Sequence, residues 1–298
     1  MWVIPGLISS FFLGIYDLFK KTSLKDNAVI PVLFYSTVIS LLMFIPFILI
    51  SIYHPAIIQN TFFEMPVPEK QEHWLIFLKA IIVASSWLLA YFSLKNLPIT
   101  IVSPVRASGP LWTLLGAILI FHEQLTVLQW SGLIITLFCY YLFSLSGKKE
   151  GIDFLRNKWV IFIFLATIIG TISSLYDKYL IIEMNRIMLQ AWFTVYMVAI
   201  LLPVLFIFWY PKRKNHPFKW RYQIIFIGIS LTLADFAYFY ALSFEDALIS
   251  ILSLLRRSSV IISFSAGAVI FKEVNIKQKS FVLVGILVGV ILIILGSS

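Results

Sequence analysis

The sequence contains few charged residues and a single cysteine. Asp, Glu, Lys and Arg make up 12% of the 298 residues, about half the share of a typical soluble domain. Because 60% of the residues are hydrophobic as well, an ordinary soluble domain is excluded. Cys139 has no cysteine partner within the chain, which excludes an intramolecular disulfide framework. This composition is typical of an integral membrane protein.

Sequence signatures of common enzymes are also missing. No G-x-x-x-x-G-K-[ST] stretch occurs, which excludes a P-loop ATPase. The four histidines are scattered and show no metal-ligand spacing. No serine, histidine and acid gather at one end of the apolar runs, so a membrane hydrolase is not indicated. We therefore expect no enzymatic activity, no metal site and no cofactor.

Ten apolar runs dominate the chain. A transmembrane helix needs about 20 mostly apolar residues, and lipid offers the backbone no hydrogen-bond partners, so each run is predicted to be a helix. The predicted fold is an all-α membrane protein with ten transmembrane helices. The runs are 2–20, 30–52, 74–94, 99–121, 126–146, 158–181, 188–210, 222–243, 248–270 and 278–296.

The basic residues collect on one side of the predicted membrane. Of the 23 Lys and Arg, 16 fall on the side of the first loop, three on the other side and four within the runs. Cytoplasmic loops carry an excess of Lys and Arg. We therefore predict a cytoplasmic first loop, external termini and an inner or plasma membrane location. The net charge of +9 then reflects topology and not binding to nucleic acid.

One stretch of the chain occurs twice. Residues 103–123 match residues 253–273 at a single spacing, with Arg106 opposite Arg256. The other correspondences are Ser108 with Ser258, Tyr16-Asp17 with Tyr176-Asp177, and Ala90-Tyr91-Phe92 with Ala237-Tyr238-Phe239. Since each copy holds five runs, an odd number, the second copy enters the membrane from the opposite face. The sequence therefore predicts an inverted-topology repeat.

Short motifs mark the end of each half. In the first half Pro110 is followed by Glu123 and then by Trp130-Ser131-Gly132. In the second half Phe271-Lys272-Glu273 precedes the last run, which contains glycines. Together with the twofold layout, these motifs resemble the EamA domains of the drug/metabolite transporter superfamily. The resemblance extends over nearly the whole chain.

The resemblance implies a secondary transporter, often an exporter, in which two halves give alternating access to a central site. We predict a first five-helix repeat at 2–146, a cytoplasmic linker at 147–157 and a second repeat at 158–296. Val260 departs from the pattern because the first copy has Pro at the matching position. Paired arginines are not general in this family, so the cargo is not carried over. A flippase for lipid-linked sugars and a non-transporting scaffold or sensor remain alternatives.

Arg106 and Arg256 stand inside predicted transmembrane runs, where a charge costs roughly 2.5–3.5 kcal/mol. A helix rises 1.5 Å per residue, which places each arginine roughly 12 Å from one membrane face and both near the centre. A guanidinium presents a planar fork that suits carboxylate or phosphate. We predict a shared cavity and a small anionic or zwitterionic cargo, such as an amino acid. The alternative is structural pairing with Asp235 or with backbone carbonyls.

Three acidic residues within the runs are candidates for gating or coupling. Asp17 and Asp177 lie near opposite faces of the predicted membrane, as paired gate residues would, and Asp235 lies deeper. Transport is predicted to be passive or coupled to protons. The alternative is local ion pairing at helical spacing. The local partners would be Lys20 or Lys21 for Asp17 and Lys178 or Arg186 for Asp177.

Aromatic and hydroxyl side chains complete the predicted binding site. Tyrosine hydroxyls need partners in hydrocarbon, which favours positions that face the cavity. A lipid-facing position is the alternative for Trp87 and Trp112. Lys79 is predicted to snorkel to the membrane surface. The candidate binding residues beside the two arginines are Tyr91, Tyr238, Tyr240, Trp112, Ser108 and Ser258.

The expected partners follow from this interpretation. They are a small-molecule substrate, membrane lipids and protons, without nucleic acid. Gly285-x-x-x-Gly289 in the last run permits close helix approach, between the halves or between two copies of the chain. The protein is therefore expected to be a monomer or a homodimer.

Overall fold

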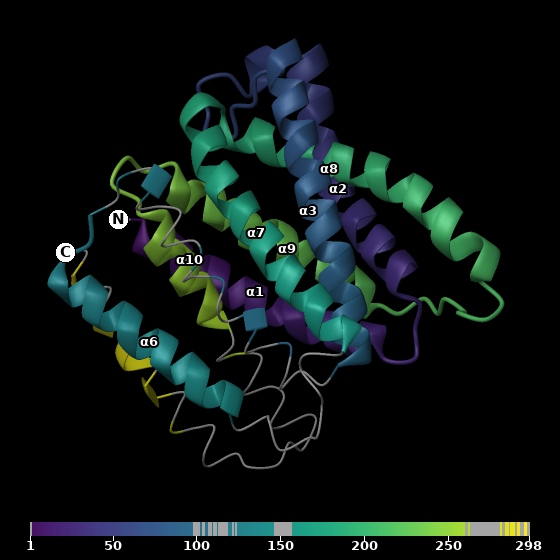
Figure 1. Cartoon of the computed structure of the whole chain (residues 1–298). Coiled ribbons are helices and arrows are strands. Elements are labelled where there is room, and N and C mark those ends of the chain that lie inside the picture. The colour runs from purple at the N-terminus through teal and green to yellow at the C-terminus, as the bar shows by residue number, and fades with distance from the viewer. Residues whose placement is uncertain are drawn as a thin grey trace.

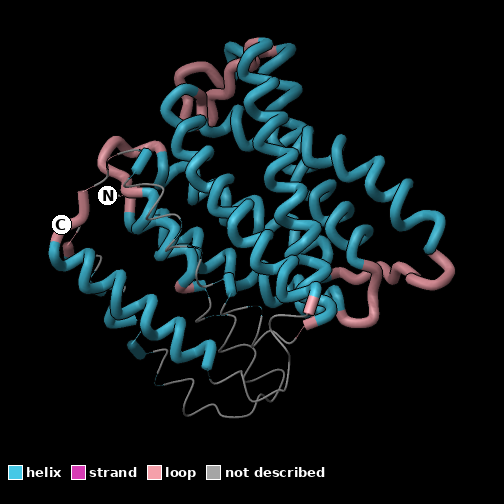
Figure 2. Tube along the Cα trace, in the orientation of Figure 1, coloured by secondary structure: helices cyan, strands magenta, loops and turns pink. Residues whose placement is uncertain are grey.

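The computed structural model consists of helices joined by loops, with no strand among the residues that it describes (Figure 2). Within the described residues, six helical stretches are long and apolar enough to cross a membrane. The chain is therefore a multi-pass membrane protein. The described residues are 2–97, 102, 105–106, 109, 112, 119–120, 122, 124–145, 157–259, 262, 281, 284–285, 287–289, 291–292 and 295–296.

The helices of the described part are arranged as one bundle, with α6 at its edge beside α10 (Figure 1). A π-helical turn, Leu205–Trp209, continues α8. The six stretches that can span a membrane are α1, α2, α3, α7, α8 with its extension to Lys212, and α9. The bounds are α1 Val3–Leu24, α2 Val29–Tyr53, α3 Lys70–Asn96, α6 Val127–Leu145, α7 Lys158–Glu183, α8 Arg186–Val204, α9 Gln223–Leu242 and α10 Ile249–Arg257.

Seven of the ten predicted runs coincide with a described helix, from α1 to α3 and from α6 to α9. The run at 248–270 begins with α10, and most of its second half lies outside the described residues. The run at 99–121 also lies mostly outside them, as does nearly all of the predicted linker at 147–157, and the run at 278–296 is described only in short pieces. The count of ten helices therefore stays a prediction.

Polar caps fix the start of three helices. The Glu72 carboxylate accepts a hydrogen bond of 2.7 Å from the Glu69 backbone N–H, which starts α3 four residues before the predicted run. The Asn157 side chain accepts from the Trp159 N–H at 2.9 Å and starts α7. The Asn185 side chain accepts a hydrogen bond from the Ile187 N–H and starts α8. Such caps typically contribute about 1 kcal/mol each.

The core brings the two halves of the chain together. The most extensive contacts are of α1 with α9 and of α3 with α7, followed by those of α2 with α9, α3 with α8, and α2 with α8. If α1, α2 and α3 are exchanged with α7, α8 and α9, the contact of α1 with α9 becomes that of α3 with α7, the contact of α2 with α9 becomes that of α3 with α8, and the contact of α2 with α8 becomes itself. The packing of the core is therefore twofold, while the inverted orientation of the halves stays a prediction.

Small polar residues hold these helix pairs close, as is common in membrane bundles. Ser9 of α1 donates to the Ala234 carbonyl of α9 at 2.7 Å, and Ser86 of α3 donates to the Ala166 carbonyl of α7 at 2.8 Å. Gly228 lets α9 approach α2 so closely that a Cβ there would lie 2.5 Å from a backbone oxygen. Close backbone packing thus frames the space between the halves.

Candidate functional site

A polar cavity of about 180 Å³ lies between α1, α3, α7, α9 and α10. It is smaller than the roughly 300–1,000 Å³ of sites for drug-sized ligands, so it suits a small metabolite. Charged side chains from both halves of the chain reach its wall. The charged lining residues are Lys20, Lys79, Arg106, Asp177, Asp235, Arg256 and Arg257.

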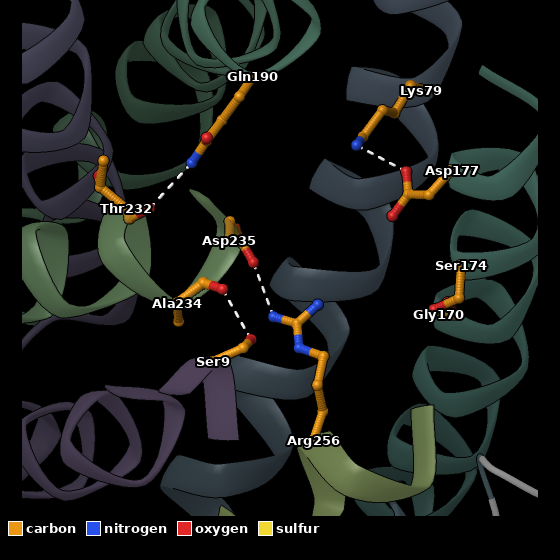
Figure 3. Close-up of polar contacts among 10 residues, drawn as sticks. All are labelled: Ser9, Lys79, Gly170, Ser174, Asp177, Gln190, Thr232, Ala234, Asp235 and Arg256. Carbon is orange, nitrogen blue, oxygen red and sulfur yellow. Dashed lines mark hydrogen bonds and ion pairs between the residues drawn. The ribbon is translucent and has the colours of Figure 1, made fainter. Parts of the chain in front are cut away.

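Arg256 at the end of α10 reaches across to α9. Its Nη2 donates to Asp235 Oδ1 at 2.7 Å, and both side chains are about one-fifth exposed (Figure 3). The guanidinium carbon also lies 4.2 Å from the centre of the Tyr238 ring. Such a position adds a cation–π attraction to the ion pair. The predicted alternative, a pair between Arg256 and Asp235, is therefore present in the structure.

Lys79 of α3 forms an ion pair with Asp177 of α7, with 2.6 Å between Nζ and Oδ1 (Figure 3). Its ammonium lies 4.6 Å from the centre of the Phe193 ring and 4.2 Å from that of Phe239. The prediction that Lys79 snorkels to the surface is wrong, because its side chain is 3% exposed and points inward. A carboxylate across the helix interface offers a nearer partner than the membrane surface.

The predicted local partners of Asp177 are also wrong. Lys178 donates to the Ala247 carbonyl at 2.6 Å, and Arg186 places its guanidinium 4.8 Å from the centre of the Phe62 ring. Asp177 instead joins the first half of the chain to the second through Lys79. The sequence neighbours therefore serve other contacts.

Asp17 of α1 is shared by two cations. Lys20 Nζ lies 2.9 Å from Asp17 Oδ1, as the local alternative predicted, and Arg106 Nη1 lies 3.8 Å from the same oxygen. The Lys20 ammonium also faces the rings of Tyr16 and Tyr91, at 4.4 Å and 5.0 Å from their centres. The hydroxyls of these tyrosines bond to each other at 2.9 Å. This cluster is cationic overall.

The two halves therefore supply two related clusters around one cavity. Each contains an aspartate and a tyrosine from matched positions, a matched arginine and a lysine. They differ in two respects. Lys79 lies on another helix than Asp177 and bridges the halves, whereas Lys20 lies one turn from Asp17 on the same helix. Among the described residues, the second cluster has a second acidic residue, Asp235, which pairs with its arginine, and the first cluster has only Asp17.

Most of the predicted site residues line the cavity. Arg106, Arg256, Tyr91, Tyr238, Asp177 and Asp235 are all on its wall, and Asp17 contacts two lining side chains. Lys20 was considered only as a partner for Asp17, and its place on the wall was missed. Lys79 was counted within an apolar run, but the need of a buried ammonium for a carboxylate partner was not applied to it.

Three predicted binding residues lie elsewhere, and a fourth is outside the described residues. Tyr240 packs against Phe62, with 5.4 Å between ring centres, because two positions along a helix turn it away from the face of Tyr238. Trp112 is exposed and is not among the lining residues. Ser258 bonds to Ser10 at 2.9 Å. Ser108 lies outside the described residues.

Arg257 and Trp87 also line the cavity. Adjacent residues differ by about 100 degrees around a helix, which would turn Arg257 away from the face of Arg256. The long side chain of Arg257 spans that difference, and both arginines reach the cavity wall. For Trp87 the cavity position replaces the lipid-facing alternative.

Comparisons with known proteins agree with this fold. The EamA-like transporter family matches residues 1–145 and 157–295. No curated protein matches the sequence. One solved crystal structure, described only as that of a protein, is 13% identical over 99% of this chain and 97% of its own, with a TM-score of 0.72. The resemblance of the two halves to EamA domains is thereby confirmed, and the chain belongs to the EamA-like transporter family, a family of membrane transporters.

Proposed function

We propose that the protein is a secondary transporter that moves small anionic or zwitterionic metabolites across the cell membrane, in the direction of export. The observation that carries this proposal is the cavity between the two halves, whose wall combines basic side chains with aspartates. Charges at this depth in a membrane protein are costly and mark substrate or ion pathways. Their convergence on one cavity supports a binding role.

Arg106, Arg256, Tyr91 and Tyr238 are the proposed substrate-binding residues. The guanidiniums supply charge and paired donors, and the tyrosines supply ring faces and hydroxyls. A scaffold or sensor would need no cavity. The described residues enclose one of about 180 Å³, which favours transport over that alternative.

Alternating access is proposed to occur by rocking of the repeat at 2–146 against the repeat at 158–296. Under the predicted topology the ion pair of Lys79 with Asp177 lies in the external half of the bundle and ties the repeats together. Asp17 has its closest partner on its own helix. Opening toward the outside would then require breaking the Lys79–Asp177 pair, and protonation of Asp177 or Asp235 would couple this step to a proton gradient.

Reconstitution into liposomes tests the proposal. The full chain should exchange at least one labelled compound from a panel of organic anions and amino acids. Arg106→Gln and Arg256→Gln should each lower that exchange by at least about tenfold, the loss expected when a hydrogen bond to a charged group is removed. Lys212→Gln removes an equal charge at an exposed position, where the extension of α8 ends, and should leave exchange unchanged.

Two results would contradict the proposal. One is the absence of exchange for every compound of the panel by a folded, correctly inserted protein. The other is full exchange activity in both arginine variants, which would remove the cavity from the transport pathway.

A further inference from the structure

Every acidic side chain that the structure describes at the cavity is already occupied by a basic side chain of the same cavity. Asp177 pairs with Lys79 at 2.6 Å, and Asp235 pairs with Arg256 at 2.7 Å. Asp17, which contacts two lining residues, pairs with Lys20 at 2.9 Å. A zwitterionic amino acid carries an ammonium that needs a carboxylate in a low-dielectric site. The described residues leave none available for it.

Five of the six aromatic rings that line the cavity already face a cation of the protein. Lys20 faces the rings of Tyr16 and Tyr91, and Lys79 faces two phenylalanine rings. Arg256 faces the ring of Tyr238. These ring faces are the second kind of group that binds an ammonium in proteins. Among the lining rings that the structure describes, only Trp87, which packs edge-on against Phe193, has no cation of the described residues over its face.

Positive charge, in contrast, is in excess. Asp17 serves both Lys20 and Arg106, and the longer of these two contacts, 3.8 Å, is that of Arg106. One carboxylate cannot neutralise two cations. A ligand with its own carboxylate or phosphate would supply the missing negative charge, and it would do so beside the arginine that presents two parallel donors.

A neutral donor completes this anion site. Tyr238 is 2% exposed, and its hydroxyl lies near the Asp177 carboxylate but makes no hydrogen bond of good geometry with the residues that the structure describes. The residue lines the same cavity as Arg106. A buried polar group without a partner is costly. An anionic oxygen is an acceptor that this hydroxyl can donate to, whereas an ammonium offers no acceptor.

We propose that the cargo is a small anion without an ammonium group, a carboxylate or a phosphate, bound by Arg106 and Lys20 with the Tyr238 hydroxyl as a further donor. This inference rests on the proposed transport function and narrows it. It also assigns unequal roles to the matched arginines. Arg106 contacts the anion, and Arg256 serves as the counter-ion that keeps Asp235 from binding an ammonium.

Matched pairs of probes that differ by one ammonium test the proposal. The full chain in liposomes is offered labelled succinate with aspartate as its partner, glutarate with glutamate as its partner, and inorganic phosphate. The inference predicts that succinate, glutarate or phosphate is exchanged, and that each dicarboxylate is exchanged at least about tenfold faster than its amino partner. If phosphate is the only probe that is exchanged, the anion is a phosphate. If only the dicarboxylates are exchanged, it is a carboxylate.

Other outcomes separate the inference from the proposed function. Exchange of aspartate or glutamate at a rate equal to that of its partner, or faster, overturns the inference and leaves transport standing. Exchange of none of these probes, while another compound of the wider panel is exchanged, likewise overturns the inference alone. Exchange of no compound overturns both.

Variants add a readout that a purely structural role would not change. Arg256→Gln leaves Asp235 without its partner, so the ratio of succinate to aspartate affinity, measured by competition, should fall by about tenfold. Lys20→Gln, which leaves Asp17 to Arg106 alone, should lower the same ratio, and it serves as the second variant if the first does not fold. Lys212→Gln is the charge-matched control. An unchanged ratio in both cavity variants overturns the inference.

Discussion

Loss of one partner from the Lys79–Asp177 pair should destabilise the bundle strongly. The two side chains are only 3% and 10% exposed, and 2.6 Å separates the charged atoms. At an effective dielectric constant of 20, their attraction is about 6 kcal/mol. Taking each ion out of water costs several kcal/mol, which offsets most of that attraction. The intact pair therefore contributes little net stability, whereas a single remaining charge is expensive.

Asp177→Asn should accordingly lower the free energy of unfolding by about 3–5 kcal/mol, because the Lys79 ammonium would stay buried without a counter-charge. Lys79→Met should have a similar effect through the stranded carboxylate. The double variant, Lys79→Met with Asp177→Leu, replaces both ions by apolar groups and should recover most of the loss. Reversible unfolding of the purified protein in detergent, or its thermal midpoint, measures all three.

The double variant also separates stability from function. If the pair closes the external side of the cavity, the recovered protein should fold and still fail to exchange substrate. Single variants as stable as the unaltered protein would refute the reasoning about burial. If the double variant is no more stable than the single variants, the intact ion pair contributes the stability, and the loss in the single variants does not come from a charge left without its partner.

Three further predictions concern packing and topology. Gly228→Ala should lower the free energy of unfolding by about 1–3 kcal/mol, because the added Cβ would meet backbone. Gly170→Ala should be tolerated, because its Cβ would lie 3.4 Å from a side-chain hydroxyl. Equal effects of the two substitutions on thermal unfolding would contradict this. Tyr91→Phe strands the Tyr16 hydroxyl and should cost about 1–3 kcal/mol, and no change would argue against that bond. Gln59→Cys should react with an impermeant thiol reagent from outside and Lys212→Cys should not, and the reverse pattern would invert the predicted topology.

Hydropathy was sufficient to locate the helices but not their inward faces. Seven predicted runs fall on described helices, because lipid leaves an apolar stretch few conformations other than a helix. Hydropathy did not locate the polar first turn of α3, because the cap formed by Glu69 and Glu72 lies before the apolar run. Hydropathy averages over a window and therefore cannot distinguish the cap from the loop.

The repeat was the more informative signal for the site. It singled out Arg106 and Arg256, and the structure places both on one cavity. It could not locate Lys79, which has no counterpart at the matching position of the other half, and its partner is 98 residues away along the chain. Tyr240 was wrongly predicted to face the cavity. The prediction considered only its polar hydroxyl and not its angle around α9 relative to Tyr238.

The central claim, that one water-accessible cavity is lined by an arginine from each half and binds the transported anion, is tested most directly by thiol accessibility. Arg106→Cys and Arg256→Cys, each in a chain with Cys139→Ser, are treated in liposomes with an impermeant anionic thiol reagent. The account predicts that both positions react and that succinate or phosphate slows the reaction at position 256, where the variant keeps Arg106 to bind the anion. Absence of reaction at both positions in folded protein, from either side of the membrane, would contradict it.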